Sequence, residues 1–174
     1  MKGISFSSLA SRLLHVPYDR SIKHATALRQ MGLYPDGRAT GDKAHVSTLQ
    51  AAHLIVMYAA NPQPTDHASV LKYLEMTDFI LELADLLQDG GEKIFSQGVR
   101  RVSISLDRPF ATIVYTDPLK ARILEEHGTQ NLSIRETEQC FGDEGARSFE
   151  RFAFVKRSAL TELAMAIQQI PVNN

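Results

Sequence analysis

The first 63 residues hold three apolar patterns with the spacing of amphipathic helices. In the first pattern, apolar residues recur every three or four positions between Phe6 and Leu14, which predicts a helix with one buried stripe. Ser5 or Ser7 is a suitable N-cap, because a side-chain hydroxyl can accept an amide hydrogen bond from the first turn. Pro17 is expected to end this helix, since the residue before a proline is pushed out of helical geometry.

The second pattern predicts a helix that begins at Asp19 or Arg20 and ends at Met31. Asp19 is the expected N-cap, and Gly32 is expected to follow the C-terminus in a left-handed conformation. The spacing predicts a buried stripe of Ile22, Ala25, Leu28 and Met31. It predicts an opposite, solvent-facing side of Arg20, Lys23, His24, Ala27 and Gln30.

A polar segment separates the second helix from the third. Residues 36–45 begin with the strong turn signal Asp-Gly and are otherwise short and polar, so we expect a small hairpin or wing there. The third helix is expected to start with Ser47 or Thr48 as its cap. It is apolar nearly all round as far as Ala59, which predicts the core helix of this region. The proline-rich segment 61–64 is a candidate domain boundary.

The remainder of the chain changes from a helical to a strand-like period. Residues 65–87 carry helical spacing, as two helices with a cap at Thr77-Asp78 or as one long helix, until Gly90-Gly91 stops it. Later residues predict strands and then an amphipathic helix ended by Pro171. The expected strands cover 99–106 and 110–115, with a short one at 132–134 and a stronger one at 149–155.

This order of elements predicts an α+β protein with three parts. Residues 1–63 form an N-terminal helix-turn-helix unit with a wing, and residues 64–91 form a helical connector. Residues 92–174 form a small antiparallel sheet with a terminal helix.

Composition excludes several classes of protein. The chain has 174 residues, of which 44% are hydrophobic and 22% charged, as in ordinary globular proteins rather than disordered ones. No apolar run approaches the roughly 18 to 20 residues that span a bilayer, and the N-terminus lacks a signal-peptide core, so we expect a cytoplasmic protein with no membrane contact. The single cysteine, Cys140, excludes an intramolecular disulfide.

The net charge of −1 hides a gradient along the chain. Residues 1–63 carry seven Lys and Arg against three Asp, a balance of +4, whereas residues 64–98 have a balance of −5. Residues 99–174 are neutral, with ten charges of each sign. The basic first third is therefore compatible with an anion-binding module.

The N-terminal motifs resemble those of the MerR-like branch of the winged helix-turn-helix superfamily. The motifs that carry the resemblance are Leu9-Ala10-Ser11-Arg12, His15-Val16, Ser21-Ile22-Lys23-His24-Ala25-Thr26, Gly32-Leu33-Tyr34-Pro35 and Arg38. The chain departs from the family pattern by three inserted residues, 18–20, and by Pro17 in place of a serine. Residues 27–38 and 47–52 also look like uncharacterised proteins of phages and prophages.

The resemblance implies that Lys23, His24 and Thr26 face DNA from the recognition helix and that Arg38 does so from the wing. Independently, a helix in the major groove needs long hydrogen-bond donors near its N-terminal end, and a wing can contact the flanking backbone. We therefore expect helix 20–31 to dock in the groove and the wing 36–45 to lie beside it. The candidate DNA contacts are Arg20, Ser21, Lys23, His24, Thr26, Arg38, Thr40 and Lys43.

These observations leave three functions open. The first is a DNA-binding transcriptional regulator of phage or prophage type, acting as a homodimer through the apolar stripe of 66–87, with the C-terminal domain available to a protein partner. The second is a DNA-packaging subunit similar to a small terminase. The third is a protein-binding anti-defence inhibitor that uses an acidic face of the connector. That face consists of Glu75, Asp78, Glu82, Asp85 and Asp89.

No pattern indicates an enzyme. The six histidines, His15, His24, His45, His53, His67 and His127, include no pair at i, i+4 and no His-Glu-x-x-His motif. Cys140 has acidic neighbours, which disfavour the reactive thiolate. No phosphate loop, dinucleotide fingerprint or nucleophile elbow occurs. We expect no catalytic residue, no cofactor and no metal site.

Overall fold

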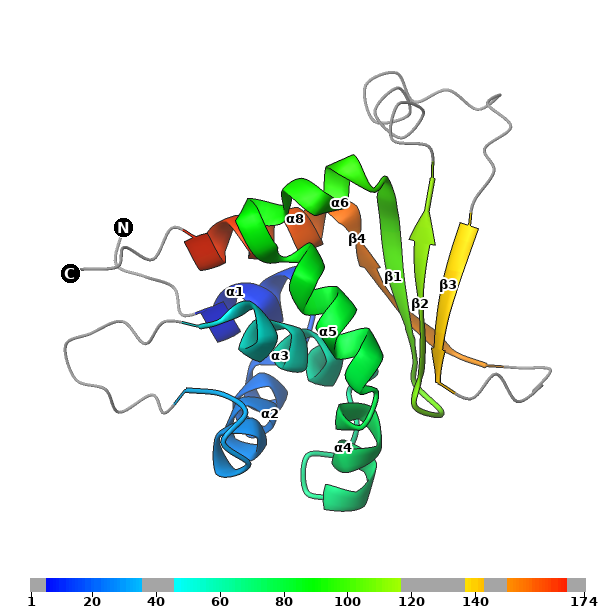
Figure 1. The fold of residues 1–174 in the computed structure, drawn as a ribbon. Coiled ribbons are helices and arrows are strands. Elements are labelled where there is room, and N and C mark those ends of the chain that lie inside the picture. Colours follow the sequence, from blue (N-terminus) through cyan, green and yellow to red (C-terminus); the bar gives the residue numbers. More distant parts are fainter. Residues whose placement is uncertain (1–5, 36–45, 117–136, 143–149, 169–174) are drawn as a thin grey trace.

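The computed structural model describes residues 6–35, 46–116, 137–142 and 150–168. It has the expected α+β architecture, in which the helices lie on one side of a four-stranded antiparallel sheet (Figure 1). Within the described residues, no helix is long and apolar enough to cross a membrane.

The first two helices differ in detail from the sequence prediction. Helix α1 spans Phe6–Leu13, so it ends four residues before Pro17. The chain leaves α1 through His15, whose φ is +55°, and the Val16 amide donates to the Ser11 carbonyl at 2.9 Å. Pro17 is instead the N-cap of α2, Tyr18–Gln30, which places Asp19 inside the first turn and corrects its expected role as the cap.

The C-terminus of α2 confirms the role of Gly32. This residue has a φ of +73°, and the following Leu33 amide donates to the Leu28 carbonyl at 2.8 Å. Glycine fits this position because a left-handed conformation costs it little.

The face that α2 buries is rotated from the predicted one. Ile22 is 45% exposed, although the spacing placed it in the buried stripe. The buried residues of α2 are Ser21, His24, Ala25, Ala27 and Leu28. Two of the expected apolar positions are therefore kept, and two polar side chains take the place of an isoleucine.

Helix α3, Thr48–Ala60, is the core helix that its composition predicts. Ser47 caps it in a reciprocal arrangement with Gln50, and the residues from Leu54 to Ala60 are all buried. Asn61 ends the helix in the left-handed conformation, with a φ of +49°.

The connector contains two separate helices rather than one long helix, which was one of the two alternatives left open by the sequence. Helix α4 is His67–Leu74 and is capped by Asp66, which accepts from the Ser69 amide at 3.2 Å. Helix α5 is Thr77–Leu86, and its N-cap is Met76 rather than the expected Thr77-Asp78. A 3₁₀ turn, η1, covers Gln88–Gly91 and leads into the short helix α6, Glu92–Ser96, which the sequence analysis missed.

The sheet has the strand order β3-β2-β1-β4. Strands β1, Val99–Ser105, and β2, Phe110–Tyr115, lie where the apolar pattern predicts them. Strand β4, Phe152–Lys156, begins three residues later than expected and runs directly into the terminal helix α8, Arg157–Gln168. Strand β3, Thr137–Gly142, was not predicted, and the strand expected at 132–134 lies outside the described residues.

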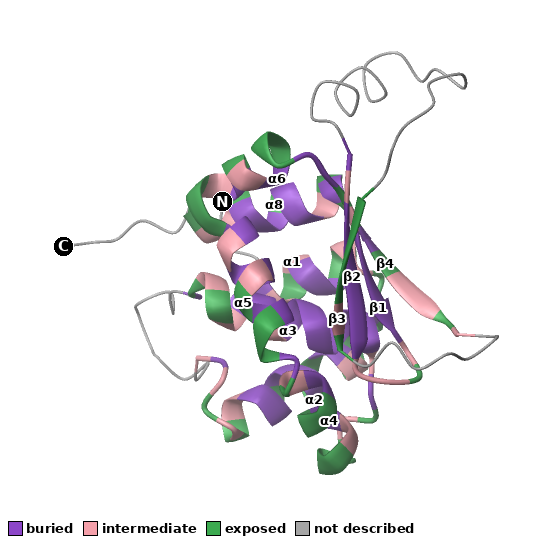
Figure 2. Cartoon of the chain, turned by 45° about the vertical axis from the view of Figure 1, so that its right-hand side comes forward, coloured by how far each residue is buried: buried purple, intermediate pink, exposed green. Residues whose placement is uncertain are grey.

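One hydrophobic core joins the helices to the sheet. Buried side chains from all three parts of the chain belong to it (Figure 2). They include Ala10 of α1, Leu54 of α3, Phe79 of α5, Ile104 of β1 and Leu160 of α8. The inner face of the sheet is therefore covered by helices that come from the N-terminal, middle and C-terminal segments.

Candidate nucleic-acid interface

The eight predicted DNA contacts divide into three groups. Lys23 and Thr26 are exposed on α2, and Arg20 is half-buried. Ser21 and His24 are buried, which corrects their assignment as DNA contacts. The predicted wing, with Arg38, Thr40 and Lys43, lies outside the described residues.

Ser21 faces the interior formed by helices α1, α2 and α3. Its hydroxyl donates to the Tyr18 carbonyl at 2.7 Å, and its own carbonyl accepts from the Tyr58 hydroxyl at 3.1 Å. Its side chain therefore serves the local structure of the first turn of α2. Because Ser21 as a whole is only 3% exposed, its hydroxyl cannot reach a DNA base.

His24 is fully buried between α2 and α3. Its Nε2 lies 3.1 Å from the Asn61 Oδ1, and its ring is tilted against the Tyr58 ring at 6.1 Å. Burial lowers the pKa of His24; the Asn61 hydrogen bond opposes this effect and the charge of Arg20 adds to it. The imidazole is therefore neutral near pH 7 and acts as a packing group.

Tyr58 connects the three N-terminal helices. Its hydroxyl lies 2.6 Å from the Ser7 Oγ of α1 and donates to the Ser21 carbonyl of α2. Burial raises the pKa of Tyr58 above its ordinary value. Arg20 reaches the same region, where its Nη2 donates to the Asn61 carbonyl at 3.4 Å. The sequence analysis missed this network because its partners are 37 to 51 residues apart.

The exposed side of α2 carries mixed chemistry. Lys23, Thr26 and Gln30 are exposed and follow the three- and four-residue steps of one helix face. Tyr18, at the start of α2, is 69% exposed. Asp19 and Ile22 are exposed on the same side, so it presents one cation, one carboxylate, an amide, two hydroxyls and an apolar side chain to solvent.

Arg29 holds the segment that follows α2. Its Nε donates to the Pro35 carbonyl at 3.1 Å, and its guanidinium lies 5.6 Å from the centre of the buried Tyr34 ring. These contacts hold Tyr34 and Pro35 against the C-terminal end of α2.

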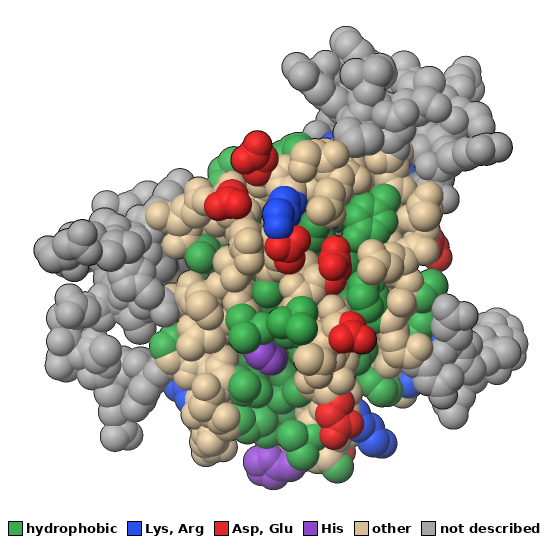
Figure 3. Space-filling model, in the orientation of Figure 1, with side chains coloured by type: hydrophobic (Ala, Val, Ile, Leu, Met, Phe, Trp, Pro, Cys, Tyr) green, Lys and Arg blue, Asp and Glu red, His purple; other side chains and the backbone are tan. Residues whose placement is uncertain are grey.

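Acidic side chains run along the connector from Glu75, at the end of α4, over α5 and into the turn that follows (Figure 3). The helix breaks near Glu75 and again after Leu86, so these carboxylates do not lie on one continuous helix as their spacing implied. Asp85 pairs with Lys93, and Glu82 accepts from the Tyr115 hydroxyl at 3.5 Å. Part of this acidic surface is thus engaged within the protein.

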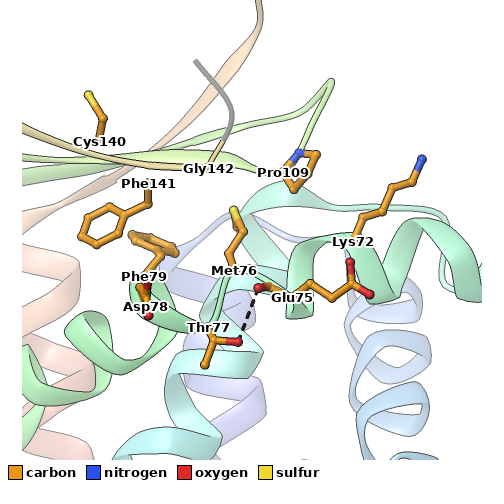
Figure 4. Close-up of a pocket in the computed structure, with 10 residues that line it drawn as sticks. All are labelled: Lys72, Glu75, Met76, Thr77, Asp78, Phe79, Pro109, Cys140, Phe141 and Gly142. Atoms are coloured by element: carbon orange, nitrogen blue, oxygen red, sulfur yellow. Dashed lines mark hydrogen bonds between the residues drawn. The ribbon is translucent and has the colours of Figure 1, made fainter. Parts of the chain in front are cut away.

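A hollow of about 440 Å³ lies between the α4–α5 turn and strand β3 (Figure 4). Phe141 points toward Phe79, with ring centres 5.3 Å apart, whereas Cys140 points to the other side of the strand. The Thr77 hydroxyl donates to the Glu75 carbonyl at 3.4 Å at its rim. Cys140, Glu75 and Asp78 all contribute to the lining of the hollow, but the Cys140 thiol points away from the side of β3 that faces Phe79.

The described residues contain no group of three or more His, Cys, Asp or Glu that could hold a metal ion. No protein-family model matches the chain, and comparisons with curated proteins and with solved structures found no match. The geometry of the described residues is therefore the basis for the function proposed below.

Proposed function

We propose that this chain is a DNA-binding regulator of phage or prophage type that inserts the exposed side of α2 into the major groove. The observation that carries the proposal is the way α2 is held. Its buried side is fixed to α1 and α3 through Tyr58, His24 and the apolar positions, while Lys23 and Thr26 remain exposed. A recognition helix needs such a rigid mount, because base contacts require defined side-chain positions.

The contact set is narrower than the sequence analysis proposed. Lys23, Thr26 and Gln30 form the groove-facing set on α2, with the half-buried Arg20 at its edge, where it also donates to the Asn61 carbonyl. Arg38, Thr40 and Lys43 remain the wing contacts. A lysine can contact guanine or a phosphate, and glutamine can contact adenine through its amide. Ser21 and His24 act indirectly, since they hold the helix that carries these side chains.

The charge distribution also supports the proposal. The basic balance of residues 1–63 lies on the part that would meet the phosphates, and the acidic connector follows it in the chain. With few cations on the exposed side of α2, we expect modest affinity that falls with salt in proportion to the small number of phosphates contacted.

The test is duplex DNA binding as a function of salt. A labelled duplex from the region upstream of the chain's own gene is titrated with wild type and with Lys23→Ala, and fluorescence anisotropy is recorded. Loss of one phosphate contact lowers the slope of log affinity against log salt by about 0.9. The matched control is Lys72→Ala, which removes an exposed lysine from α4.

The proposal fails if wild type binds no duplex, or if Lys23→Ala and Lys72→Ala give the same affinity and the same salt slope as wild type. A double variant, Lys23→Ala with Arg38→Ala, tests the recognition helix and the wing together. It is expected to bind more weakly than either single variant.

The number of copies in solution separates the regulator from a packaging subunit. Leu71 and Leu81 are about half exposed on α4 and α5, so these helices offer an apolar surface for the homodimer that the regulator requires. Light scattering is expected to give a dimer, whereas a ring of many copies favours packaging. Leu81→Lys is expected to shift a dimer toward monomer.

A further inference from the structure

Strand β4 forms one edge of the four-stranded sheet. In the strand order β3-β2-β1-β4 it pairs with β1, and no described strand pairs with its other side (Figures 1 and 2). An open edge presents a row of backbone N–H and C=O groups, which can form hydrogen bonds with the strand of another chain. The residues that supply these groups therefore define a possible binding surface.

The register of β4 with β1 determines which residues face the open edge. The Leu106 amide donates to the Arg151 carbonyl at 2.9 Å, in the register of the β1–β4 pair. Hydrogen-bonded positions recur at every second residue of an antiparallel pair, so the backbone groups of Ala153 and Val155 also face β1. The alternate positions point their backbone groups to the open edge. These positions are Phe152, Phe154 and Lys156.

The side chains of these three residues share the outer face of the sheet, opposite the helices. Val155, which lies between two of them, is buried in the core, and side chains alternate between the two faces along a strand. Phe154 is 61% exposed and Lys156 is exposed, whereas Phe152 is half-buried, with its ring centre 6.5 Å from that of Phe154. The edge thus combines open hydrogen-bonding groups with an exposed aromatic surface.

This edge is complementary to a second copy of itself. Two copies of a strand that are related by a two-fold axis run antiparallel. An axis at Phe154 places Phe154 opposite its own copy and Phe152 opposite Lys156. Each of these pairs exchanges both backbone hydrogen bonds, so the open groups of all three residues gain partners. A register displaced along the edge leaves at least one of the three opposite a residue outside β4.

The side chains favour the same register. The two exposed Phe154 rings meet across the axis, and cross-strand aromatic pairs stabilise a sheet. Each Lys156 ammonium lies beside a Phe152 ring of the other copy, where the face of the ring attracts a cation. The two lysines lie at opposite ends of the paired strands and so do not repel each other. An axis at Lys156 would instead place them directly opposite, which destabilises a strand pair.

We propose that β4 pairs with β4 of a second copy of this chain, centred on Phe154, so that two sheets join into one continuous antiparallel sheet. This contact lies apart from the α4–α5 surface of the proposed dimer and does not depend on DNA binding. Two different two-fold contacts on one chain link dimers into larger assemblies. One short strand makes a contact smaller than the roughly 1,200 Å² of stable interfaces, so it fills at higher concentrations than the α4–α5 dimer.

Sedimentation velocity of the full-length Leu81→Lys variant isolates this contact, because that substitution is expected to remove the α4–α5 dimer. We expect a monomer–dimer equilibrium with a dissociation constant on the order of 100 µM. On the same background, Phe154→Lys places two like charges opposite each other and removes the ring pair, so self-association should be at least about tenfold weaker. The control is Ile22→Lys, which adds the same charge at an exposed position of α2 and should leave self-association unchanged.

A pair of opposite charges at position 152 tests the register. Phe152→Glu places a carboxylate opposite Lys156 at both ends of the paired strands, whereas Phe152→Lys places an ammonium there. Both variants lose the same ring, and on the Leu81→Lys background we expect Phe152→Glu to associate at least about fivefold more tightly. Ile22→Glu and Ile22→Lys are the matched control pair and should associate equally. Similar thermal unfolding of the two Phe152 variants shows that a difference in association is not a loss of folding.

Three outcomes would overturn the proposal. They are a Leu81→Lys protein that stays monomeric up to about 1 mM, a Phe154→Lys variant that associates as tightly as its background, and equal association of Phe152→Glu and Phe152→Lys. In the first case the open edge would be available to an extended segment of another protein instead. If wild type and Leu81→Lys associate equally and Phe154→Lys abolishes that association, the β4 pairing is supported and the α4–α5 dimer of the proposed function is wrong.

Discussion

Helix α2 and strand β4 both present a cation near an exposed apolar side chain, but they do so for opposite reasons. On α2, Ile22 is exposed because Ser21 and His24 occupy the interior. On β4, Phe154 is exposed because the helices that the structure describes pack against the other side of the sheet. An exposed apolar residue thus reflects hidden polar contacts in one region and an uncovered surface in the other.

The difference lies in what each element packs against. Helix α2 packs against α1 and α3. Tyr58 of α3 and Asn61 at its end supply hydrogen-bond partners for Ser21 and His24, which offsets the free-energy cost of burying these polar residues. Among the described strands, β4 pairs through its backbone with β1, and its side chains must alternate between the core and the outside. Because one hydrophobic core joins the helices to the sheet, α2 and β4 should belong to a single cooperatively folding unit.

The largest expected effect tests that unit. Phe79→Ala removes a fully buried ring from α5 that packs against Phe141 of β3, and should cost about 3–5 kcal/mol. Because one core joins helices and sheet, unfolding in urea should remain a single transition by both circular dichroism and Tyr fluorescence. Met165→Ala, at a half-exposed position of α8, should cost less than about 1 kcal/mol.

Two separate transitions in that experiment would mean that the helical region and the sheet are independent units. A loss in Met165→Ala as large as that in Phe79→Ala would also contradict the assignment of the core.

The second largest effect concerns Glu150, which holds Arg108 beside the Phe110 ring at one end of the sheet. Glu150→Gln replaces a carboxylate that Arg108 contacts with two nitrogens and that also accepts from Ser105, so we expect a loss of about 1.5–3 kcal/mol. Arg12→Ala breaks the Arg12–Glu162 pair, whose side chains are more than half exposed, and should cost about 0–1 kcal/mol. Urea denaturation at pH 7 measures both, and equal losses would argue against a specific role for Glu150.

Much of the fold follows from hydrophobic spacing alone. The period of the apolar residues predicts α1, α3, β1, β2 and α8, since each buries one regular face or is buried all round. The exposed strand β3 could not be predicted, because its first four positions are exposed to solvent and show no apolar alternation. Helix α6 escaped because five residues are too few to show a period.

The candidate sites could be predicted only in part. Positions 21, 24, 25 and 28 satisfy the helical spacing as well as 22, 25 and 28 do, so the sequence could not choose which face of α2 is buried. Tyr58 and Asn61 decide it, and they lie more than 30 residues away. The continuous apolar run of β4 likewise gives no face for Phe154 until its register with β1 is known.

The smallest effect tests the buried side of α2 through pH. Burial lowers the pKa of His24 in the folded protein, so the unfolded chain binds more protons as the pH falls below about 6.5. The stabilising contribution of the neutral imidazole is therefore complete above that pH and is lost progressively below it. Each extra proton taken up on unfolding gives a slope of at most about 1.4 kcal/mol per pH unit.

Urea denaturation between pH 5 and 7 measures this slope, and His24→Gln is expected to reduce it. His53 is the matched comparison, because burial lowers the pKa of His53 as well, although its Nδ1 lies 2.8 Å from the Leu49 carbonyl and near the surface. The hydrogen bond from Arg108 lowers the pKa of Glu150, so the contribution of that carboxylate lies below this window. If His24→Gln leaves the slope of unfolding free energy against pH unchanged while His53→Gln reduces it, the imidazole of His24 is not held neutral among α1, α2 and α3. That side of α2 would then be open to solvent, and the contrast with β4 would be lost.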